Sequence, residues 1–155
     1  MDLDRALRIS AAGMQAQSTR LRVVAENLAN KDSTGSSPGA DPYRRKTVTF
    51  GAQVERGLGA GGAGVSTVKV TRVGTAPGDF TETYDPSHPA ADARGYVKRP
   101  NVDSLVEIMD MREAQRSYSA NVSVLEVTRG LLTRILESLR CRRSARSTRR
   151  MRASS

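Results

Sequence analysis

The stretch SLVEIMDMREAQRSYSANVSVLEVTRGLLTRILESL, residues 104–139, carries bulky side chains at a seven-residue spacing. The main row is Met111, Tyr118, Leu125, Leu132 and Leu139, and a companion row three residues earlier contains Ile108, Val122 and Leu136. Such a repeat is typical of helices that pack as coiled coils. It predicts a helix over 103–139, on the order of 55 Å long at 1.5 Å per residue. Ser104 and Glu107 predict a capping box at its start.

A second heptad pattern lies at the other end of the chain, over residues 1–30. Its apolar row is Leu7, Met14, Leu21 and Leu28, and a row of small residues contains Ala11, Ser18 and Ala25. Small residues allow close helix approach but bury little area, so this helix is not expected to be stable alone. Gly13 in its interior costs about 1 kcal/mol relative to alanine. The two helices are therefore expected to pair with each other in antiparallel orientation.

Residues 31–102, between the helices, differ in character. Loops rich in Gly, Ser and Pro alternate with strand-like stretches, which we expect at 43–50, 65–73 and 80–84. Asp85-Pro-Ser-His-Pro89 predicts a turn, because each proline disfavours helix at the residue before it. The sequence thus predicts an α+β protein, with heptad helices at 1–30 and 103–139 paired as a coiled-coil-like hairpin around a small β-rich insert.

Positive charge is concentrated at the C-terminus. The 155 residues carry 25 Lys and Arg against 16 Asp and Glu, a net charge of +9. Seven arginines and no acidic residue lie in 140–155, so residues 1–139 are nearly neutral. This Arg/Ser-rich tail is predicted to be disordered. The aromatic content of 4% argues against a large aromatic-packed enzyme core, and the single Cys excludes an internal disulfide.

Candidate chemical motifs are weak. Gly57, Gly59 and Gly62 match a dinucleotide fingerprint by letters, but more Gly and a strand follow where the phosphate-binding helix should begin. His88 near Asp85 and Asp92 lacks a second His or a Cys, so an exposed or structural role is favoured over a metal or catalytic site. Cys141, among arginines, has no catalytic partners nearby in sequence. We therefore predict no enzyme, cofactor, metal or small-molecule substrate.

Four motifs carry a resemblance to a known family: SAAGMQAQ at 10–17, RLRVVAENLAN at 20–30, PYRRK at 42–46 and YDPSHPAADARGYVKRPNV at 84–102. The first two are similar to the N-terminal signature of bacterial flagellar rod and hook axial proteins, and the last two resemble the proximal rod members. SYSANVSVL at 117–125 also fits. The motif residues carried over are Asn27, Asn30, Tyr43, Arg44, Arg45, Tyr84, Asp85, Pro86, His88, Pro89, Gly95, Tyr96, Pro100 and Asn101.

The resemblance implies a structural subunit of the flagellar basal-body rod. Such a subunit would be exported without a cleaved signal peptide by the flagellar type III apparatus. It would polymerise in the periplasm with copies of itself and other rod proteins, and transmit torque from motor to hook. Its helices would pack against neighbouring subunits. The residues expected in that packing are Leu7, Met14, Leu21, Leu28, Ile108, Met111, Tyr118, Val122, Leu125, Leu132, Leu136 and Leu139.

Two other readings compete with this one. A basic coiled-coil protein could bind nucleic acid through the tail, and Arg44-Arg45-Lys46 could begin a further basic patch. A small hydrolase using His88 is the third reading. The near-neutral body and the specific motifs favour the rod subunit, so nucleic acid is not the expected partner. The tail at 140–155 has no counterpart in the family pattern.

Overall fold

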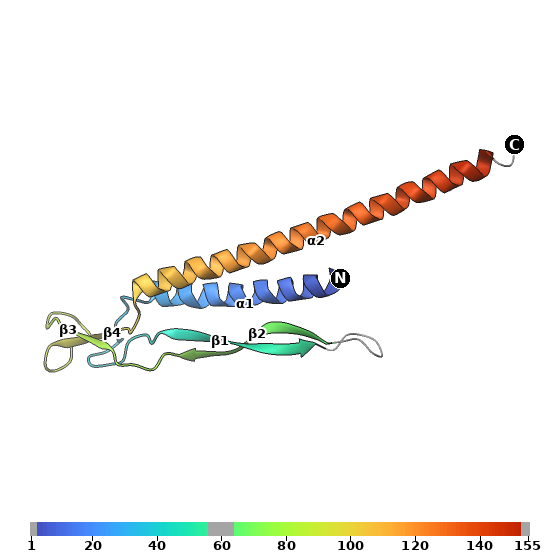
Figure 1. Ribbon diagram of the computed structural model, residues 1–155. Coiled ribbons are helices and arrows are strands. Elements are labelled where there is room, and N and C mark those ends of the chain that lie inside the picture. Colours follow the sequence, from blue (N-terminus) through green and yellow to red (C-terminus); the bar gives the residue numbers. More distant parts are fainter. Residues whose placement is uncertain (1–2, 56–63, 153–155) are drawn as a thin grey trace.

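The chain folds into two long helices and two small β-sheets. The computed structural model describes residues 3–55 and 64–152, with side chains for 3–54 and 64–140. Helix α1 spans Leu3–Ala29 and helix α2 spans Ser104–Arg152. The four strands lie between them in sequence (Figure 1). This order confirms the predicted helix, β insert and helix.

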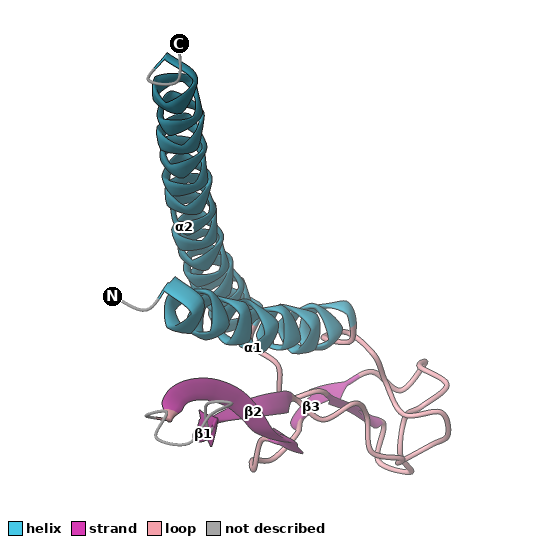
Figure 2. Ribbon diagram, turned by 90° about the vertical axis from the view of Figure 1, so that its right-hand side faces the viewer, coloured by secondary structure: helices cyan, strands magenta, loops and turns pink. Residues whose placement is uncertain are grey.

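The helices pack in antiparallel orientation. Asn27, near the end of α1, contacts Glu107 in the first turn of α2, and Gly13 lies against Asn121. Helix α1 also contacts both strands of the longer hairpin, so it lies between α2 and that hairpin (Figure 2). Continuing the pairing places Leu3 opposite Leu131. Helix α2 therefore runs past the start of α1, as Figure 1 shows.

The first turn of α2 is capped by Asp103. Its Oδ1 accepts hydrogen bonds from the backbone N–H groups of Leu105 at 2.8 Å and Val106 at 3.4 Å. The predicted capping box of Ser104 and Glu107 is therefore wrong. Aspartate is among the preferred N-cap residues, and here it takes the role one position earlier. The Glu107 carboxylate is instead engaged with residues far away in sequence.

The longer sheet is a hairpin of β1 (Lys46–Glu55) and β2 (Val65–Thr75). The pairing runs from Lys46 opposite Thr75 to Glu55 opposite Val65, with a register shift between Thr49 and Phe50. A shorter sheet pairs β3 (Thr81–Tyr84) with β4 (Tyr96–Arg99). The three predicted strands are confirmed within a few residues. Strand β4 was not predicted, because its sequence Tyr-Val-Lys-Arg shows no alternation of apolar and polar residues.

The turn predicted at 85–89 is confirmed, since the His88 N–H donates to the Asp85 carbonyl at 3.2 Å. Gly95, just before β4, has φ +82°, and a Cβ there would lie 3.0 Å from the Tyr84 ring. Glycine is thus required at this position for both conformation and space. The glycine fingerprint at Gly57, Gly59 and Gly62 lies outside the described residues.

The buried apolar core consists of small side chains. Its members are Ala16, Val23, Val24, Val65, Ala90, Val97 and Ala114. No Leu, Ile, Met or aromatic residue is among the buried side chains of the described residues. A core of this composition buries little apolar area for each residue that is ordered.

Helix α2 does not end near Leu139 as predicted, because its backbone continues to Arg152. The tail, predicted to be disordered over 140–155, is thus helical in its backbone as far as Arg152. No Gly or Pro occurs between Leu131 and Arg152 to stop a helix, and Arg and Ala favour one. Residues 153–155 lie outside the described residues.

Candidate functional site: a polar cluster and exposed apolar rows

Asn27 lies at the junction of α1, α2 and β1, with 1% of its surface exposed. Its Oδ1 accepts hydrogen bonds from the Tyr43 hydroxyl and the Lys46 backbone N–H, both at 2.8 Å. Its Nδ2 donates to the Lys46 carbonyl at 2.9 Å and to Glu107 Oε2 at 3.1 Å. Every hydrogen-bonding site of the amide is used. The two hydrogen bonds between the Asn27 amide and the Lys46 backbone resemble those that a neighbouring strand would make at the edge of β1.

Charged residues surround this amide. The Glu107 side chain is fully buried, and its Oε1 accepts a hydrogen bond from Arg45 Nε at 2.5 Å. Arg20 of α1 pairs with Asp110 of α2 at 2.7 Å, and Arg45 reaches the same carboxylate at 3.5 Å. We call this group the Asn27 cluster: Arg20, Asn27, Tyr43, Arg45, Lys46, Glu107 and Asp110. It joins both helices and the insert at one end of the hairpin.

At the edge of the cluster, hydrogen bonds and burial shift the pKa values of Glu26, Lys46 and Tyr43. The Lys46 ammonium donates to Glu26 Oε2 at 2.9 Å, which lowers the pKa of Glu26 and raises the pKa of Lys46. Burial raises the pKa of the Tyr43 phenol, so this group stays protonated as a donor to Asn27 at neutral pH. Asn101 Oδ1 accepts from the Arg45 backbone N–H at 2.9 Å and extends the network to the loop before α2.

The row of α2 that faces α1 is small and polar. Glu107, Ala114 and Thr128 are buried at a seven-residue spacing, and Asn121, at the same spacing, meets Gly13. The seven-residue period of the packing was predicted correctly, but the side chains that carry it inside the subunit were not. On α1 the buried face is Ser10, Ala16, Val23, Val24 and Asn27. Ala16 and Val23, seven apart, were a signal in the sequence that could have identified it.

The apolar rows predicted for subunit packing lie beside this buried face rather than within it. Exposed members are Ile108 at 39%, Tyr118 at 38%, Leu136 at 65% and Leu139 at 57%. The others are half-buried: Leu7, Met14, Leu21, Leu28, Met111, Val122, Leu125 and Leu132. None of the twelve is fully buried, so each retains surface that another chain can cover.

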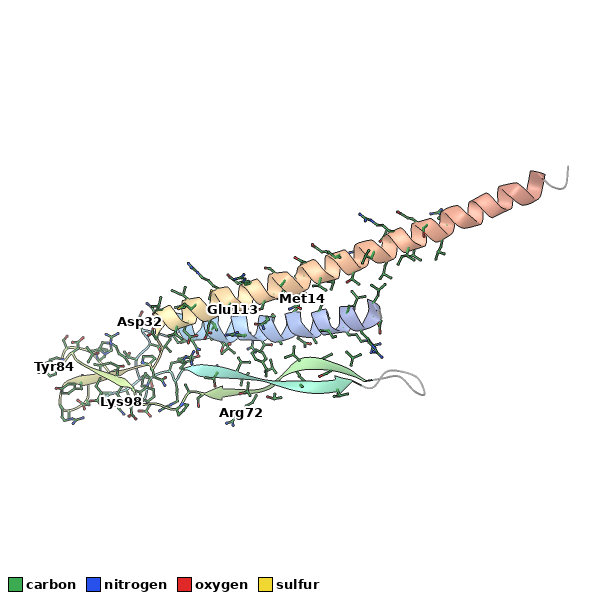
Figure 3. All side chains as sticks on the ribbon, viewed as in Figure 1. Met14, Asp32, Arg72, Tyr84, Lys98 and Glu113 are labelled. Carbon is green, nitrogen blue, oxygen red and sulfur yellow. The ribbon has the colours of Figure 1, made fainter. Side chains whose placement is uncertain are left out.

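Helix α2 carries further exposed apolar residues that the sequence analysis did not single out. Val124, Val127, Leu131 and Ile135 follow each other at spacings of three, four and four residues and are 47%, 64%, 47% and 48% exposed. Such spacing places them on one side of the helix. Leu105, Val106 and Met109 are exposed near its start. Figure 3 shows side chains standing out from α2 along the part that runs beyond α1.

The remaining family-motif residues build the β3–β4 end. Tyr84 and Tyr96 meet edge to face with ring centroids 5.3 Å apart, and Tyr84 is labelled at this tip in Figure 3. The His88 Nδ1 accepts from the Ala90 backbone N–H at 3.1 Å, so His88 serves the turn. Pro86 packs near Gly95. Pro89 lies in the turn and Pro100 lies before α2. Asn30 lies just after α1, where its Nδ2 donates to the Glu26 carbonyl.

Two aspartates hold the same tip. The Asp85 carboxylate accepts from the Ser87 hydroxyl at 2.7 Å, which lowers the pKa of Asp85. The Asp92 carboxylate accepts from the Tyr96 backbone N–H at 2.8 Å and the Arg94 backbone N–H at 2.9 Å. Those hydrogen bonds, led by the one from Tyr96, lower the pKa of Asp92. Over the described residues, no group of three His, Cys, Asp or Glu side chains could hold a metal ion.

The basic triplet considered for nucleic acid is engaged inside the subunit. The Arg44 guanidinium lies over the Phe80 ring at 4.3 Å and donates to the Gly78 carbonyl at 2.8 Å. Arg45 and Lys46 belong to the Asn27 cluster. The triplet therefore does not form a free basic patch. Neither helix, over the part of the chain that the structure describes, has an apolar run that could span a lipid bilayer.

Two family models match the chain. Residues 7–35 match the model described as flagella basal body rod protein, and residues 93–138 match the one described as flagellar basal body rod FlgEFG protein C-terminal. Asn27 lies in the first matched region, whereas Glu107 and Asp110 lie in the second. The Asn27 cluster thus joins the two matched regions by hydrogen bonds and an ion pair.

Similar proteins cover nearly the whole chain. It is 51% identical over 138 residues to the flagellar basal-body rod protein FlgC of Agrobacterium fabrum, covering 89% of this chain and 96% of that relative. Identity to FlgC of Bacillus subtilis is 40% over 142 residues, covering 84% and 94%. For FlgC of Salmonella typhimurium it is 41% over 128 residues, covering 83% and 91%. The chain belongs to the FlgC family of flagellar basal-body rod proteins and is a non-enzymatic, structural subunit of the rod.

Proposed function

We propose that the chain assembles with copies of itself and with other rod proteins by burying the exposed apolar rows of α2, and that the resulting shaft transmits torque from motor to hook. The observation that carries this proposal is the placement of polar and small residues inside the hairpin and of large apolar residues outside it. Glu107 and Ala114 are 0% exposed, whereas Leu136 is 65% and Met109 64% exposed. That arrangement suits a helix whose apolar side chains are covered by neighbours.

The exposed area supports the same proposal. The folded chain exposes 11440 Å². A compact monomer of 16.7 kDa would expose about 7,600 Å². The excess belongs to an extended hairpin whose second helix is not matched in length by the first. Contacts with neighbouring subunits would remove part of this area from water, and head-to-tail contacts that do not close generate a helical assembly.

The segments of the chain would then have separate roles. Helical residues 1–30 and 103–139 would form the assembly core, and the insert at 31–102 would lie against its outside. Export by the flagellar type III apparatus would precede assembly. A core of small side chains supports this order, because a subunit with little buried apolar area unfolds readily for threading. Strong hydrogen-exchange protection along both entire helices in the free subunit would contradict that last point.

Leu136→Glu tests the assembly proposal. The side chain lies in the part of α2 beyond α1, so the charge leaves the monomer's fold unchanged and opposes only burial against a neighbour. In a host lacking its own FlgC, we expect this variant to be produced and helical but to give no swimming and no complete rods. Thr133→Glu, at an exposed polar position of the same segment, is the matched control and should swim. Normal rods with Leu136→Glu would exclude this surface as an interface.

Cross-linking locates the contacts directly. Cysteine placed at Tyr118 or Leu125, with Cys141→Ser in the same chain, should cross-link to a neighbouring rod subunit in isolated basal bodies. The same residues in the purified monomer should stay uncross-linked at low concentration. Cysteine at Ala16, which is 2% exposed inside the hairpin, should give no intermolecular product in either sample.

A further inference from the structure

The interface between α1 and α2 contains little that could fix how far one helix slides along the other. Gly13, Arg20 and Asn27 of α1 recur every seven residues, as do Glu107, Ala114, Asn121 and Thr128 of α2. The close contact at Gly13 involves a flexible amide, and Ala114 buries only a methyl group. Two helices with matching periods and small contact residues can meet again after a shift of one heptad, which is about 10 Å.

The polar contacts break this near-equivalence. A one-heptad shift in one direction brings Asn27 opposite Ala114, and a shift in the other brings it opposite Pro100, before α2 begins. In both cases Glu107 loses Asn27, and in the first it loses any partner on α1. Glu107 is fully buried, so the loss of the Asn27 amide as the donor to one of its carboxylate oxygens is costly. Buried polar residues at heptad positions are known to select one register in this way, at some cost in stability.

We propose that Asn27 and Glu107 are the specificity-determining residues that select the register of α1 on α2. Arg45 and Lys46 extend this selection to the insert, because both belong to the same cluster. When a single register is selected, the exposed apolar rows of α1 and α2 keep one fixed position relative to each other along the helix axes.

Disulfide trapping in the full-length chain tests the proposal, with Cys141→Ser in every variant. Gly13→Cys with Asn121→Cys reports the observed register, because a Cβ at Gly13 would lie about 3 Å from the Asn121 side chain. Gly13→Cys with Ala114→Cys, or with Thr128→Cys, reports a shift of one heptad in each direction. Asn121→Ala accompanies these two pairs, so that the new Cβ meets no amide. A disulfide cannot bridge two neighbouring heptads, because it needs Cα atoms within roughly 7 Å.

With the cluster intact, we expect oxidation to give the 13–121 disulfide and little of the other two. In the Asn27→Leu/Glu107→Leu background both members of the pair are replaced by apolar groups of similar size, so neither faces an unpaired polar group on the other helix. Tyr43, Arg45 and Lys46 each lose a hydrogen-bond partner in this background. The ratio of shifted to observed-register disulfide should then rise by about tenfold or more, the factor that corresponds to losing one hydrogen-bonded charged pair. Glu113→Leu, at an exposed position on the same helix, is the control and should leave the ratio unchanged.

If the double variant gives no helical circular dichroism, Glu107→Gln carries the same test. It keeps the side-chain shape and removes the charge that Arg45 compensates, so a smaller rise in the same direction is expected. A 13–121 disulfide that stays dominant in both folded backgrounds would overturn the proposal. That result would leave the assembly surface on α2 untouched, because Leu136 and its neighbours do not take part in this measurement.

Discussion

Asn27 of α1 donates a hydrogen bond to the buried carboxylate of Glu107 in α2 at 3.1 Å, across 80 positions of sequence. The amide also serves Tyr43 and both backbone groups of Lys46, so one side chain connects the two helices and the first strand. The structure of the subunit is therefore organised around a polar junction rather than around a large apolar core. Several measurable consequences depend on that junction.

Asn27→Ala should be strongly destabilising. It removes four hydrogen bonds and leaves the Lys46 backbone groups and one Glu107 oxygen without their partner. We expect the free energy of unfolding to fall by about 3 kcal/mol. Urea denaturation followed by circular dichroism measures this change. Asn30→Ala is the control, because the Asn30 amide makes one hydrogen bond, to the Glu26 carbonyl, and its loss should cost under about 1 kcal/mol.

Glu107→Gln should destabilise the subunit while Glu113→Gln does not. The first change removes the fully buried negative charge that pairs with the Arg45 guanidinium, which is 25% exposed. Breaking one side of a buried pair costs about 3 kcal/mol. Glu113 is exposed and its recorded hydrogen bond, from Ser117, is long at 3.5 Å. Equal denaturation midpoints for the two variants would show that burial of Glu107 is energetically unimportant.

The two glycines in the helices should respond differently to alanine. A Cβ at Gly130 would meet nothing within 4 Å, so Gly130→Ala should stabilise the isolated subunit by about 1 kcal/mol through helix propensity. A Cβ at Gly13 would lie 2.9 Å from Asn121 Nδ2, so the same gain is offset by displacing that amide. Adding Asn121→Ala should restore the gain at Gly13. Thermal unfolding of the single and double variants gives the coupling between the two positions.

The β3–β4 tip should lose stability in acid. Hydrogen bonds from backbone N–H groups place the folded-state pKa of Asp92 below its ordinary value of 3.8. The charge of Asp92 therefore stabilises the fold above about pH 3.8, and this contribution disappears as the pH falls through the lower folded-state pKa. Asp85 behaves in the same direction. Tyrosine fluorescence of Tyr84 and Tyr96 between pH 7 and pH 2 should report the loss, and Asp92→Asn should reduce its pH dependence.

Deleting residues 141–155 should leave swimming intact. The C-terminal family match ends at residue 138, and the similar FlgC proteins cover 83% to 89% of this chain. The truncated chain should be produced and should restore motility in a host lacking FlgC. Loss of swimming at a normal protein level would instead assign the arginine-rich tail a role in assembly or export.

The architecture was accessible from sequence because its signals are periodic or local. The rows through Leu125 and Leu21 indicated two heptad helices, and the strand-like stretch at 65–73 indicated a strand. What the sequence did not reveal was which heptad row faces inward. Apolar side chains usually mark the buried face, but here Glu107 and Thr128 are buried while Leu136 is exposed. In the proposed assembly, neighbouring subunits would cover Leu136, which accounts for this reversal of the usual rule.

The Asn27 cluster escaped prediction for a related reason. Asn27, Tyr43 and Arg45 were identified only as motif residues, and Glu107 was assigned to a capping box. Each is polar and lies in a different segment, so no spacing within one element connects them. Their complementarity appears only when the antiparallel pairing brings residue 27 to residue 107. The capping role of Asp103 was not predicted either, because Asp103 and Ser104 are adjacent and both are residue types that cap helices.

The uneven distribution of contacts along α1 has a further consequence. Arg20 and Asn27 hold its C-terminal half, whereas Gly13 and Ala16 offer only close contact without large side chains. Opening of the hairpin should therefore begin at the N-terminal end of α1 and stop at the cluster, giving amide exchange that slows progressively from Leu7 to Val24. A subunit built in this way can release one end of a helix while its overall fold stays in place.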